Sequence, residues 1–321
     1  MRLLRLALPL PWSFGLFLLV ILPCQTIAQE REPADIIKVN TDLVVFDAQV
    51  INKKTKQLVS GLTKEDFELT DKGVRQQITY FSRDELPLSI ILLLDVSRSV
   101  RSIIHDIRDG ALNALRRLKP DDQVAVMAFA TTSKLAQNFT KDRGLTSRKI
   151  EEATATAALG DATLVARALE SAAIHMQSAP APRSRRVIIV ITDNIAASAG
   201  RIQQDALDQL LETGAVVYGL IVRGPVGKVF NIMSFGQIKG VNKFVDETGG
   251  EILGADKKEV DARLGEVIDR LRARYAIGFR PTNITDDDSF RRVEIRIPEV
   301  RQGKEKLVVL TKRGYYLRRK Q

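Results

Sequence analysis

The chain has 321 residues, 45% of them hydrophobic and 27% charged, a globular composition that excludes collagen-like, disulfide-scaffold and intrinsically disordered chains. Lys and Arg number 49 against 39 Asp and Glu, and this charge of +10 favours nucleic acid or acidic lipid only where it is clustered. A single cysteine and two histidines exclude an intrachain disulfide and a thiolate zinc site, and leave few residues for imidazole chemistry.

The N-terminal segment predicts export. Arg2 and Arg5 precede an apolar stretch from Leu6 to Cys24, and small residues ending at Ala28 precede a charged run. This order is typical of a secretory signal peptide, so we expect residues 1–28 to be removed and the protein to be secreted or periplasmic. The alternative is an uncleaved membrane anchor, because the stretch is nearly long enough to span a bilayer. No later apolar run reaches that length, so we expect no transmembrane helix after cleavage.

Residues 36–85 alternate between apolar and polar side chains with period two. The pattern predicts antiparallel β-structure with one exposed face. Turn-like segments separate the expected strands, which lie at residues 43–50, 67–70 and 77–81.

Residues 86–274 alternate continuous apolar runs with segments of helical spacing. Strands that are apolar on both faces belong in a parallel sheet covered by helices, so we expect a doubly wound α/β domain with a mostly parallel sheet. The apolar runs lie at residues 88–94, 124–129, 187–191 and 216–222. The helical patterns lie at residues 103–115, 165–173 and 260–271.

Residues 275–321 return to strand patterns. Neither this segment nor residues 36–85 alone offers many strands for a sandwich. We therefore expect the two segments to pair into one β-domain, with the α/β domain inserted between its halves. The expected strands lie at residues 275–279, 292–297, 306–310 and 315–317.

Polar side chains follow two of the apolar runs. In a doubly wound sheet, ligands bind outside the carboxyl ends of the strands. Asp95, Ser97 and Ser99 follow the first run, and Asp193 follows the third. Thr163 lies between them in a loop at a predicted helix start. We therefore expect these five side chains to converge at one edge of the sheet.

Two carboxylates and three hydroxyls make an all-oxygen site, which suits Mg²⁺ and also Mn²⁺ or Ca²⁺. When only one or two carboxylates approach the ion, its charge is incompletely neutralised, and an acidic group from a partner can complete the shell. The expected partner therefore offers an acidic group such as an Asp or Glu carboxylate. We expect no nucleic-acid partner, because the positive charge is spread along the chain apart from a short basic C-terminus.

These residues resemble the metal-ion-dependent adhesion site of von Willebrand factor type A domains. The resemblance covers the whole α/β region and implies an adhesion-type, non-enzymatic module that binds a protein. It implies that Ser97, Ser99 and Thr163 are direct or switchable hydroxyl ligands, and that Asp95 and Asp193 act largely through bound water. The segments that carry it are Leu92-Leu93-Leu94-Asp95-Val96-Ser97-Arg98-Ser99, the Thr163 loop and Ile191-Thr192-Asp193.

Two positions depart from the pattern usual in such domains. Asp161-Ala162-Thr163 stands where Gly-Gly-Thr is usual, and Thr192-Asp193-Asn194 stands where Thr-Asp-Gly is usual. Asn tolerates a positive φ better than most residues, so Asn194 is a mild change. Asp161 either supplies extra charge near the ion or caps the following helix, and we favour the cap.

The flanking segments are similar to those of exported type A domain proteins of soil bacteria. This similarity concerns the architecture and specifies no ligand. It is carried by Leu62-Thr63-x-Glu65-Asp66-Phe67, Tyr275-x-Ile277-Gly278-Phe279 and Arg313-Gly314-Tyr315.

Two other functions remain open. One is a structural envelope protein that keeps the metal motif without using it. The other is a phosphatase, because an apolar strand followed by Asp-x-Ser-x-Ser is close to the Asp-x-Asp-x-Thr opening of haloacid-dehalogenase phosphatases. Ser97 stands where that chemistry needs a second carboxylate, and a hydroxyl cannot replace it as a general acid.

Overall fold

The computed structural model describes residues 43–155, 159–180, 183–195, 200–223, 240–282, 290–302 and 306–316. These ranges lie in one compact unit, Thr41–Gln321. The expected signal peptide at residues 1–28 lies outside the described residues. Within the described ranges, no helix combines the length and the apolar character that a membrane crossing needs.

A six-stranded sheet in the order β10-β9-β8-β5-β6-β7 forms the centre of the α/β region. Neighbouring strands pair in parallel except at one edge, where β7 is antiparallel to β6. The predicted fold class, an α/β fold with a mostly parallel sheet, is confirmed. The strands are β5 (Leu88–Asp95), β6 (Gln123–Phe129), β7 (Ser133–Thr140), β8 (Arg185–Thr192), β9 (Val216–Val222) and β10 (Ile252–Ala255).

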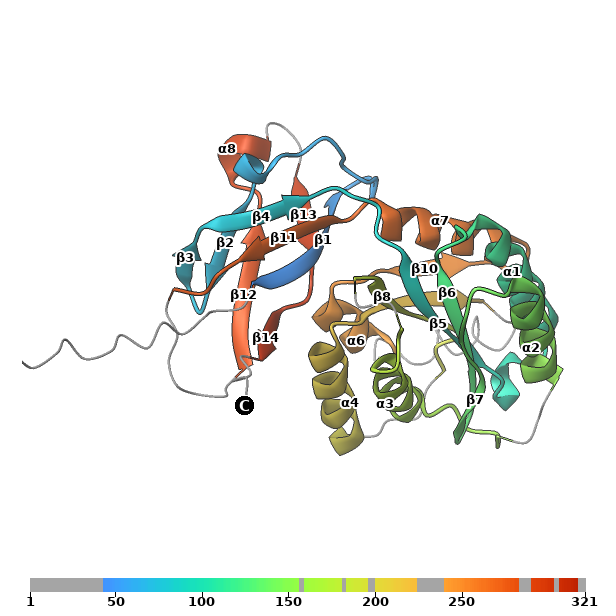
Figure 1. Ribbon diagram of the computed structural model, residues 1–321. Helices are drawn as coiled ribbons and strands as arrows, with labels where there is room; N and C mark the ends of the chain where they lie inside the picture. Colours follow the sequence, from blue (N-terminus) through green and yellow to red (C-terminus); the bar gives the residue numbers. More distant parts are fainter. Residues whose placement is uncertain are drawn as a thin grey trace, which may run out of the picture. The chain divides into compact units, whose positions relative to one another are not determined.

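Strand β5 is buried along its whole length because helices cover both faces of the sheet (Figure 1). Its side chains alternate between two cores, with Ile90 and Leu92 in the first and Ile91 and Leu93 in the second. The first core is covered by α1 (Ile104–Ala114), α2 (Arg143–Ala155) and α7 (Val260–Arg272). The second core is covered by α3 (Val165–Met176), α4 (Gly200–Thr213) and α6 (Asn242–Thr248).

Strands from before and after the α/β region share two four-stranded sheets, in the orders β13-β1-β11-β4 and β14-β12-β2-β3. The pairs that join the two segments are antiparallel. A third core, which includes Phe46, Ile277, Phe279 and Ile295, lies in these sheets. Their strands are β1 (Val44–Asn52), β2 (Glu68–Asp71), β3 (Val74–Gln76), β4 (Ile78–Ser82), β11 (Tyr275–Phe279), β12 (Phe290–Arg296), β13 (Leu307–Leu310) and β14 (Gly314–Tyr316).

Short helices occupy several of the connections between these elements. One of these connectors, η2 (Arg98–Val100), is separated from the end of β5 by two residues. The short helices are η1 (Lys64–Asp66), η2 (Arg98–Val100), η3 (Leu115–Arg117), η4 (Lys257–Glu259) and α8 (Glu299–Gln302).

Two buried arginines join the α/β region to β1. Arg185 at the start of β8 donates to the carbonyls of Leu271 at 2.9 Å and Arg274 at 2.7 Å. Arg274 in turn donates to the carbonyls of Asp47 at 2.9 Å and Gly249 at 3.0 Å. Because guanidinium groups cannot be deprotonated in proteins, these carbonyls are needed to offset their burial.

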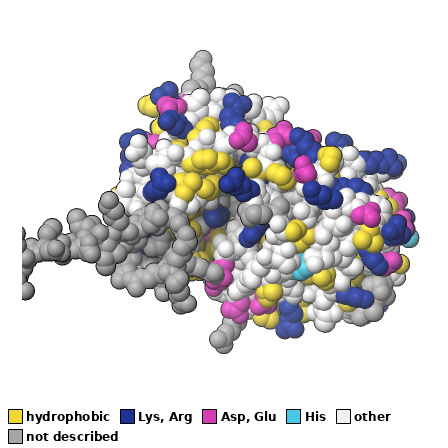
Figure 2. All heavy atoms as spheres, viewed as in Figure 1, with side chains coloured by type: hydrophobic (Ala, Val, Ile, Leu, Met, Phe, Trp, Pro, Cys, Tyr) yellow, Lys and Arg dark blue, Asp and Glu magenta, His cyan; other side chains and the backbone are white. Residues whose placement is uncertain are grey.

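Charged side chains of both signs are interspersed with apolar ones over the face shown in Figure 2. Pairs such as Arg263 with Glu266 at 2.8 Å and Lys141 with Asp121 at 2.9 Å bring opposite charges together on the surface. Exposed pairs of this kind contribute little to stability, about 0–1 kcal/mol each. Much of the positive charge is therefore balanced locally by acidic neighbours.

Candidate metal site

The ends of two neighbouring strands place Asp95 next to Thr192. Strands β5 and β8 are parallel, and Leu94 of β5 pairs with Ile191 of β8. The residues that follow these two are consequently neighbours, and Thr192 Oγ1 donates to Asp95 Oδ2 at 2.5 Å. Both side chains are fully buried. The register of two apolar strands thus orients one carboxylate oxygen of the site.

The turn after β5 brings two hydroxyls together. The backbone N–H of Ser97 donates to Asp95 Oδ1 at 2.9 Å, an Asx-type contact that closes the turn. Val96 is buried in the first core and anchors the chain on the sheet. The Oγ atoms of Ser97 and Ser99 then lie 3.2 Å apart. The Asp-x-Ser-x-Ser segment therefore presents oxygens from three side chains close together.

The loop before α3 brings Thr163 to the same place. Thr163 Oγ1 donates to Ser97 Oγ at 2.8 Å, and the Thr163 side chain is buried. The loop is held by the Leu164 N–H, which donates to the Ala130 carbonyl at 3.0 Å. Gly160 has a φ of +93° and lies where a Cβ would be 2.4 Å from Thr131 Oγ1, so only glycine fits there.

Asp193 completes the group at the end of β8. Its side chain is 8% exposed, and its Oδ1 accepts the Ile195 N–H at 3.1 Å. Burial raises the pKa of Asp193, while hydrogen bonds from the Ile195 N–H and the Ser99 hydroxyl act in the opposite direction. The five residues expected from the sequence therefore lie together, linked by short polar contacts.

The burial of Asp95 destabilises the ionised form of its carboxyl group. Burial raises its pKa from 3.8 to about 6, and the negative charge of Asp193 adds to the rise. Hydrogen bonds from Ser97 and Thr192 lower the pKa but do not cancel the effect of burial. A cation nearby would relieve both the desolvation and the repulsion between the two carboxylates.

The donor set fits a hard divalent cation. Each side-chain atom of this group that could bind a metal is an oxygen, the ligand type that Mg²⁺ and Ca²⁺ prefer. Neighbouring ligands of six-coordinate Mg²⁺ lie about 3 Å apart, since each Mg–O distance is about 2.1 Å. The single hydroxyl oxygen of Ser97 lies 2.8 Å from Thr163 Oγ1 and 3.2 Å from Ser99 Oγ, close to this spacing.

The cluster is poor in carboxylates. Among the described residues, no three His, Cys, Asp or Glu side chains are grouped so that they could hold a metal ion. Asp95 and Asp193 are two, and the remaining oxygens of the cluster come from hydroxyls. A cation here would therefore keep part of its positive charge unneutralised.

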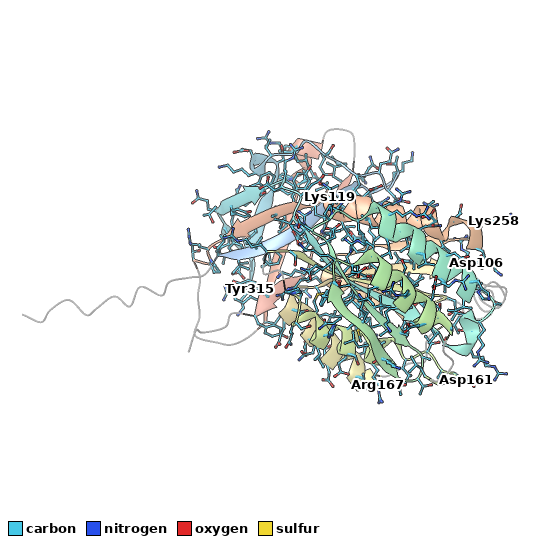
Figure 3. All side chains as sticks on the ribbon, turned by 45° about the vertical axis from the view of Figure 1, so that its right-hand side comes forward. Asp106, Lys119, Asp161, Arg167, Lys258 and Tyr315 are labelled. Atoms are coloured by element: carbon cyan, nitrogen blue, oxygen red, sulfur yellow. The ribbon has the colours of Figure 1, made fainter. Side chains whose placement is uncertain are left out.

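Asp161 does not cap α3, so the cap predicted for it is wrong. The N-cap position of α3 is Leu164, which makes no side-chain cap hydrogen bond. Instead, Asp161 Oδ1 accepts from Arg101 Nη2 at 2.9 Å, and the Asp161 carbonyl accepts the Arg98 N–H at 3.2 Å. Figure 3 shows Asp161 at the end of the α/β region remote from Lys119, which precedes β6. Asp161 thus links the Thr163 loop to η2.

Asn194 has a role that the sequence did not reveal. Its φ is +61°, in the positive range that asparagine was expected to tolerate. In addition, its Oδ1 accepts the Val241 N–H at 3.0 Å, and its Nδ2 donates to Asn242 Oδ1 at 3.3 Å. Its own N–H donates to Thr192 Oγ1 at 3.0 Å. The side chain therefore ties the loop that carries Asp193 to the start of α6.

Residues 90–196 match the sequence model of the von Willebrand factor type A domain. No curated protein matches the chain. Solved structures with a similar chain path include BatB from Bacteroides thetaiotaomicron, with 18% identity, 57% of this chain and 98% of that chain covered, and a TM-score of 0.44. The mussel byssus protein PTMP1 with a zinc-occupied MIDAS motif has 15% identity, covers 58% of this chain and 48% of its own, and has a TM-score of 0.45. A von Willebrand factor type A protein from Catenulispora acidiphila has 11% identity, covers 86% and 75%, and has a TM-score of 0.47. Residues 90–196, within the α/β part of the chain, belong to the von Willebrand factor type A domain family.

Proposed function

We propose that the chain is an exported, metal-dependent protein-binding module. Type A domains commonly bind proteins and mostly act as interaction modules rather than enzymes. The observation that carries the proposal is the group of two buried carboxylates and three hydroxyls at the carboxyl ends of β5 and β8. The proposed ligands, direct or through water, are Asp95, Ser97, Ser99, Thr163 and Asp193.

A bound Mg²⁺ or Mn²⁺ would supply a positive charge that attracts a carboxylate of the partner. Ser97, Ser99 and Thr163 would offer neutral oxygens, which leave the charge of the ion largely intact. Asp95, oriented by Thr192 and by the Ser97 N–H, would supply a carboxylate to the ion, directly or through water. The partner would contribute the Asp or Glu oxygen that this set lacks, so its affinity would depend on the divalent ion.

The metal claim is tested by titrating the purified full chain, freed of divalent ions, with Mg²⁺ and Mn²⁺. Ligand binding to the folded state raises stability by about 2.7 kcal/mol at a ligand concentration a hundred times Kd, so the melting temperature should rise. Asp95→Ala and Thr163→Val should abolish the rise. Asp161→Asn is the matched control, because Asp161 is an exposed carboxylate on the same loop and is no proposed ligand. A melting temperature that ignores both ions and the Asp95→Ala change would refute the site.

The partner claim is tested by capture with immobilised protein in Mg²⁺ and in EDTA. A metal-dependent module should lose its partner in EDTA and after the Thr163→Val substitution. A partner that is retained under both conditions would favour the structural envelope role, with an unused motif. Phosphatase turnover that Asp95→Asn abolishes would instead favour an enzyme.

A further inference from the structure

Arg98 lies inside the candidate metal site yet contributes only its backbone to it. It stands between Ser97 and Ser99 in the chain, and its N–H donates to the Asp161 carbonyl at 3.2 Å. The Ser97 carbonyl accepts the Val100 N–H at 3.3 Å, which closes the turn around it. The Arg98 side chain is exposed. A fixed backbone thus presents a long cationic side chain beside the hydroxyls.

The charge of Arg98 is not neutralised within the described part of the chain. Arg101, one helical turn further on, pairs with Asp161 at 2.9 Å. Within the described ranges, Arg98 has no carboxylate within ion-pair distance. Of these two arginines beside the site, Arg98 is therefore the one available to an outside anion.

We propose that Arg98 is a second anchor for the partner, which presents two acidic side chains in one extended segment. This inference rests on the proposed function, because the first carboxylate would complete the shell of the bound cation. The second carboxylate would then accept hydrogen bonds from the Arg98 guanidinium. Arginine suits this role because its planar fork matches both oxygens of a carboxylate.

The spacing of the two acids follows from the geometry of an extended chain. Alternate side chains of a strand point to the same face and lie about 7 Å apart along it. Arg98 is one Cα–Cα step, about 3.8 Å, from Ser97 and from Ser99, and its side chain is exposed. The motif that we assign to the partner is acidic-x-acidic, because this is the shortest spacing that puts two carboxylates on one face of an extended peptide, where one can complete the cation shell and the other can reach Arg98.

The inference is tested with short, end-blocked synthetic peptides whose cores are Glu-x-Glu, Glu-x-Gln and Gln-x-Gln. Chemical-shift titrations of the full chain in Mg²⁺ and in EDTA measure their dissociation constants. We expect Glu-x-Glu to bind about fivefold more tightly than Glu-x-Gln, the effect of a good exposed ion pair. In the Arg98→Gln variant the two peptides should bind equally. Arg167→Gln, a change in an exposed arginine of α3 at the same end as Asp161 (Figure 3), should preserve the ratio.

The outcomes separate this inference from the proposed function. An unchanged ratio in Arg98→Gln, with magnesium-dependent binding intact, overturns only the role of Arg98. Binding that is the same in EDTA as in Mg²⁺, or absent for each peptide, overturns the proposed function and this inference together. The magnesium-induced rise in melting temperature of Arg98→Gln should equal that of the wild type, which confirms that the variant folds and that its metal site is intact.

Discussion

Thr192 donates its hydroxyl hydrogen to Asp95 across 2.5 Å and joins the ends of strands β8 and β5. The other oxygen of Asp95 accepts the Ser97 N–H. The carboxylate is thus oriented from two sides by groups that belong to the fold itself. Because the Asp95 carboxylate is already oriented, it does not have to reorient when a ligand binds.

The substitution Thr192→Val should therefore weaken the site without touching a proposed ligand. Valine keeps the shape of threonine but leaves Asp95 Oδ2 buried without this donor, which costs about 1–3 kcal/mol of unfolding free energy. Loss of a hydrogen bond that orients a metal ligand lowers metal affinity about 10–100-fold. Calorimetric Mg²⁺ titration and chemical denaturation measure both effects. Thr192→Ser keeps the hydroxyl and should behave like the wild type, and equal results for the two variants would refute the role of Thr192.

Asp95→Asn should stabilise the metal-free protein while it removes the metal response. The fully buried Asp95 carboxylate lacks full compensation, as its raised pKa of about 6 shows. Asparagine removes the charge, and the Thr192 hydroxyl can rotate to accept from the new amide. Relief of such functional strain is worth about 0.5–2 kcal/mol.

The measurement for Asp95→Asn is thermal unfolding in EDTA and in Mg²⁺. In EDTA the variant should melt above the wild type, and in Mg²⁺ the order should reverse. Asp161→Asn removes an exposed carboxylate and should leave both melting temperatures nearly unchanged. A variant that is less stable than the wild type in EDTA would show that the buried charge is already compensated.

The sequence allowed the site to be predicted as a group, because apolar strands fix where their polar successors lie. Once β5 and β8 are read as neighbouring parallel strands, Asp95 and Asp193 must share an edge. The fold class and the type A domain are confirmed. The ligand roles of the five residues and the domain boundaries at 36–85, 86–274 and 275–321 stay predictions.

Other contacts could not be predicted because they depend on tertiary structure. The ion pair of Arg101 with Asp161 joins segments that are far apart in the sequence, and no local pattern distinguishes it from a helix cap. Strand β7 was not expected either. It is an edge strand with shifts in its register to β6, and of its residues only Gln137 is buried. Such a strand lacks the alternation on which strand prediction relies.

A buried ionic group in the sheet β14-β12-β2-β3 gives a third prediction. Arg291 Nη2 and Asp71 Oδ2 lie 2.8 Å apart with both side chains fully buried, and the Tyr315 hydroxyl donates to the same oxygen at 3.0 Å. This environment raises the pKa of Tyr315 through burial and the charge of Asp71. Asp71→Asn should cost about 3–5 kcal/mol, because it leaves the guanidinium charge buried without its partner.

The double variant Asp71→Leu with Arg291→Met is the control for that ion pair. Replacing both charges by apolar groups should cost much less than the single change, since no buried charge remains. Far-UV circular dichroism in urea is the suitable measurement, because Trp12 is the only tryptophan and lies in the predicted signal peptide. A single variant within about 1 kcal/mol of the wild type would contradict the prediction.

His175 gives the last prediction, a dependence of stability on pH away from the metal site. Its ring stacks on Phe139 with centroids 5.5 Å apart and planes at 2°. Burial lowers its pKa below the ordinary value of 6.5. The unfolded chain therefore takes up a proton at a higher pH than the folded protein does. The contribution of neutral His175 to the free energy of unfolding is fully present above about pH 6.5. It is lost as the pH falls through the pKa of the folded state.

His175→Phe should accordingly reduce the loss of stability between about pH 7.5 and about pH 5, because phenylalanine keeps the ring and takes up no proton. Urea denaturation at the two pH values measures the difference for each variant. His105→Gln changes the other histidine, which is exposed on α1, and should leave the pH dependence as in the wild type. If His175→Phe loses as much stability on acidification as the wild type, the buried imidazole is not the group that titrates, and the carboxylates of the fold account for the acid sensitivity instead.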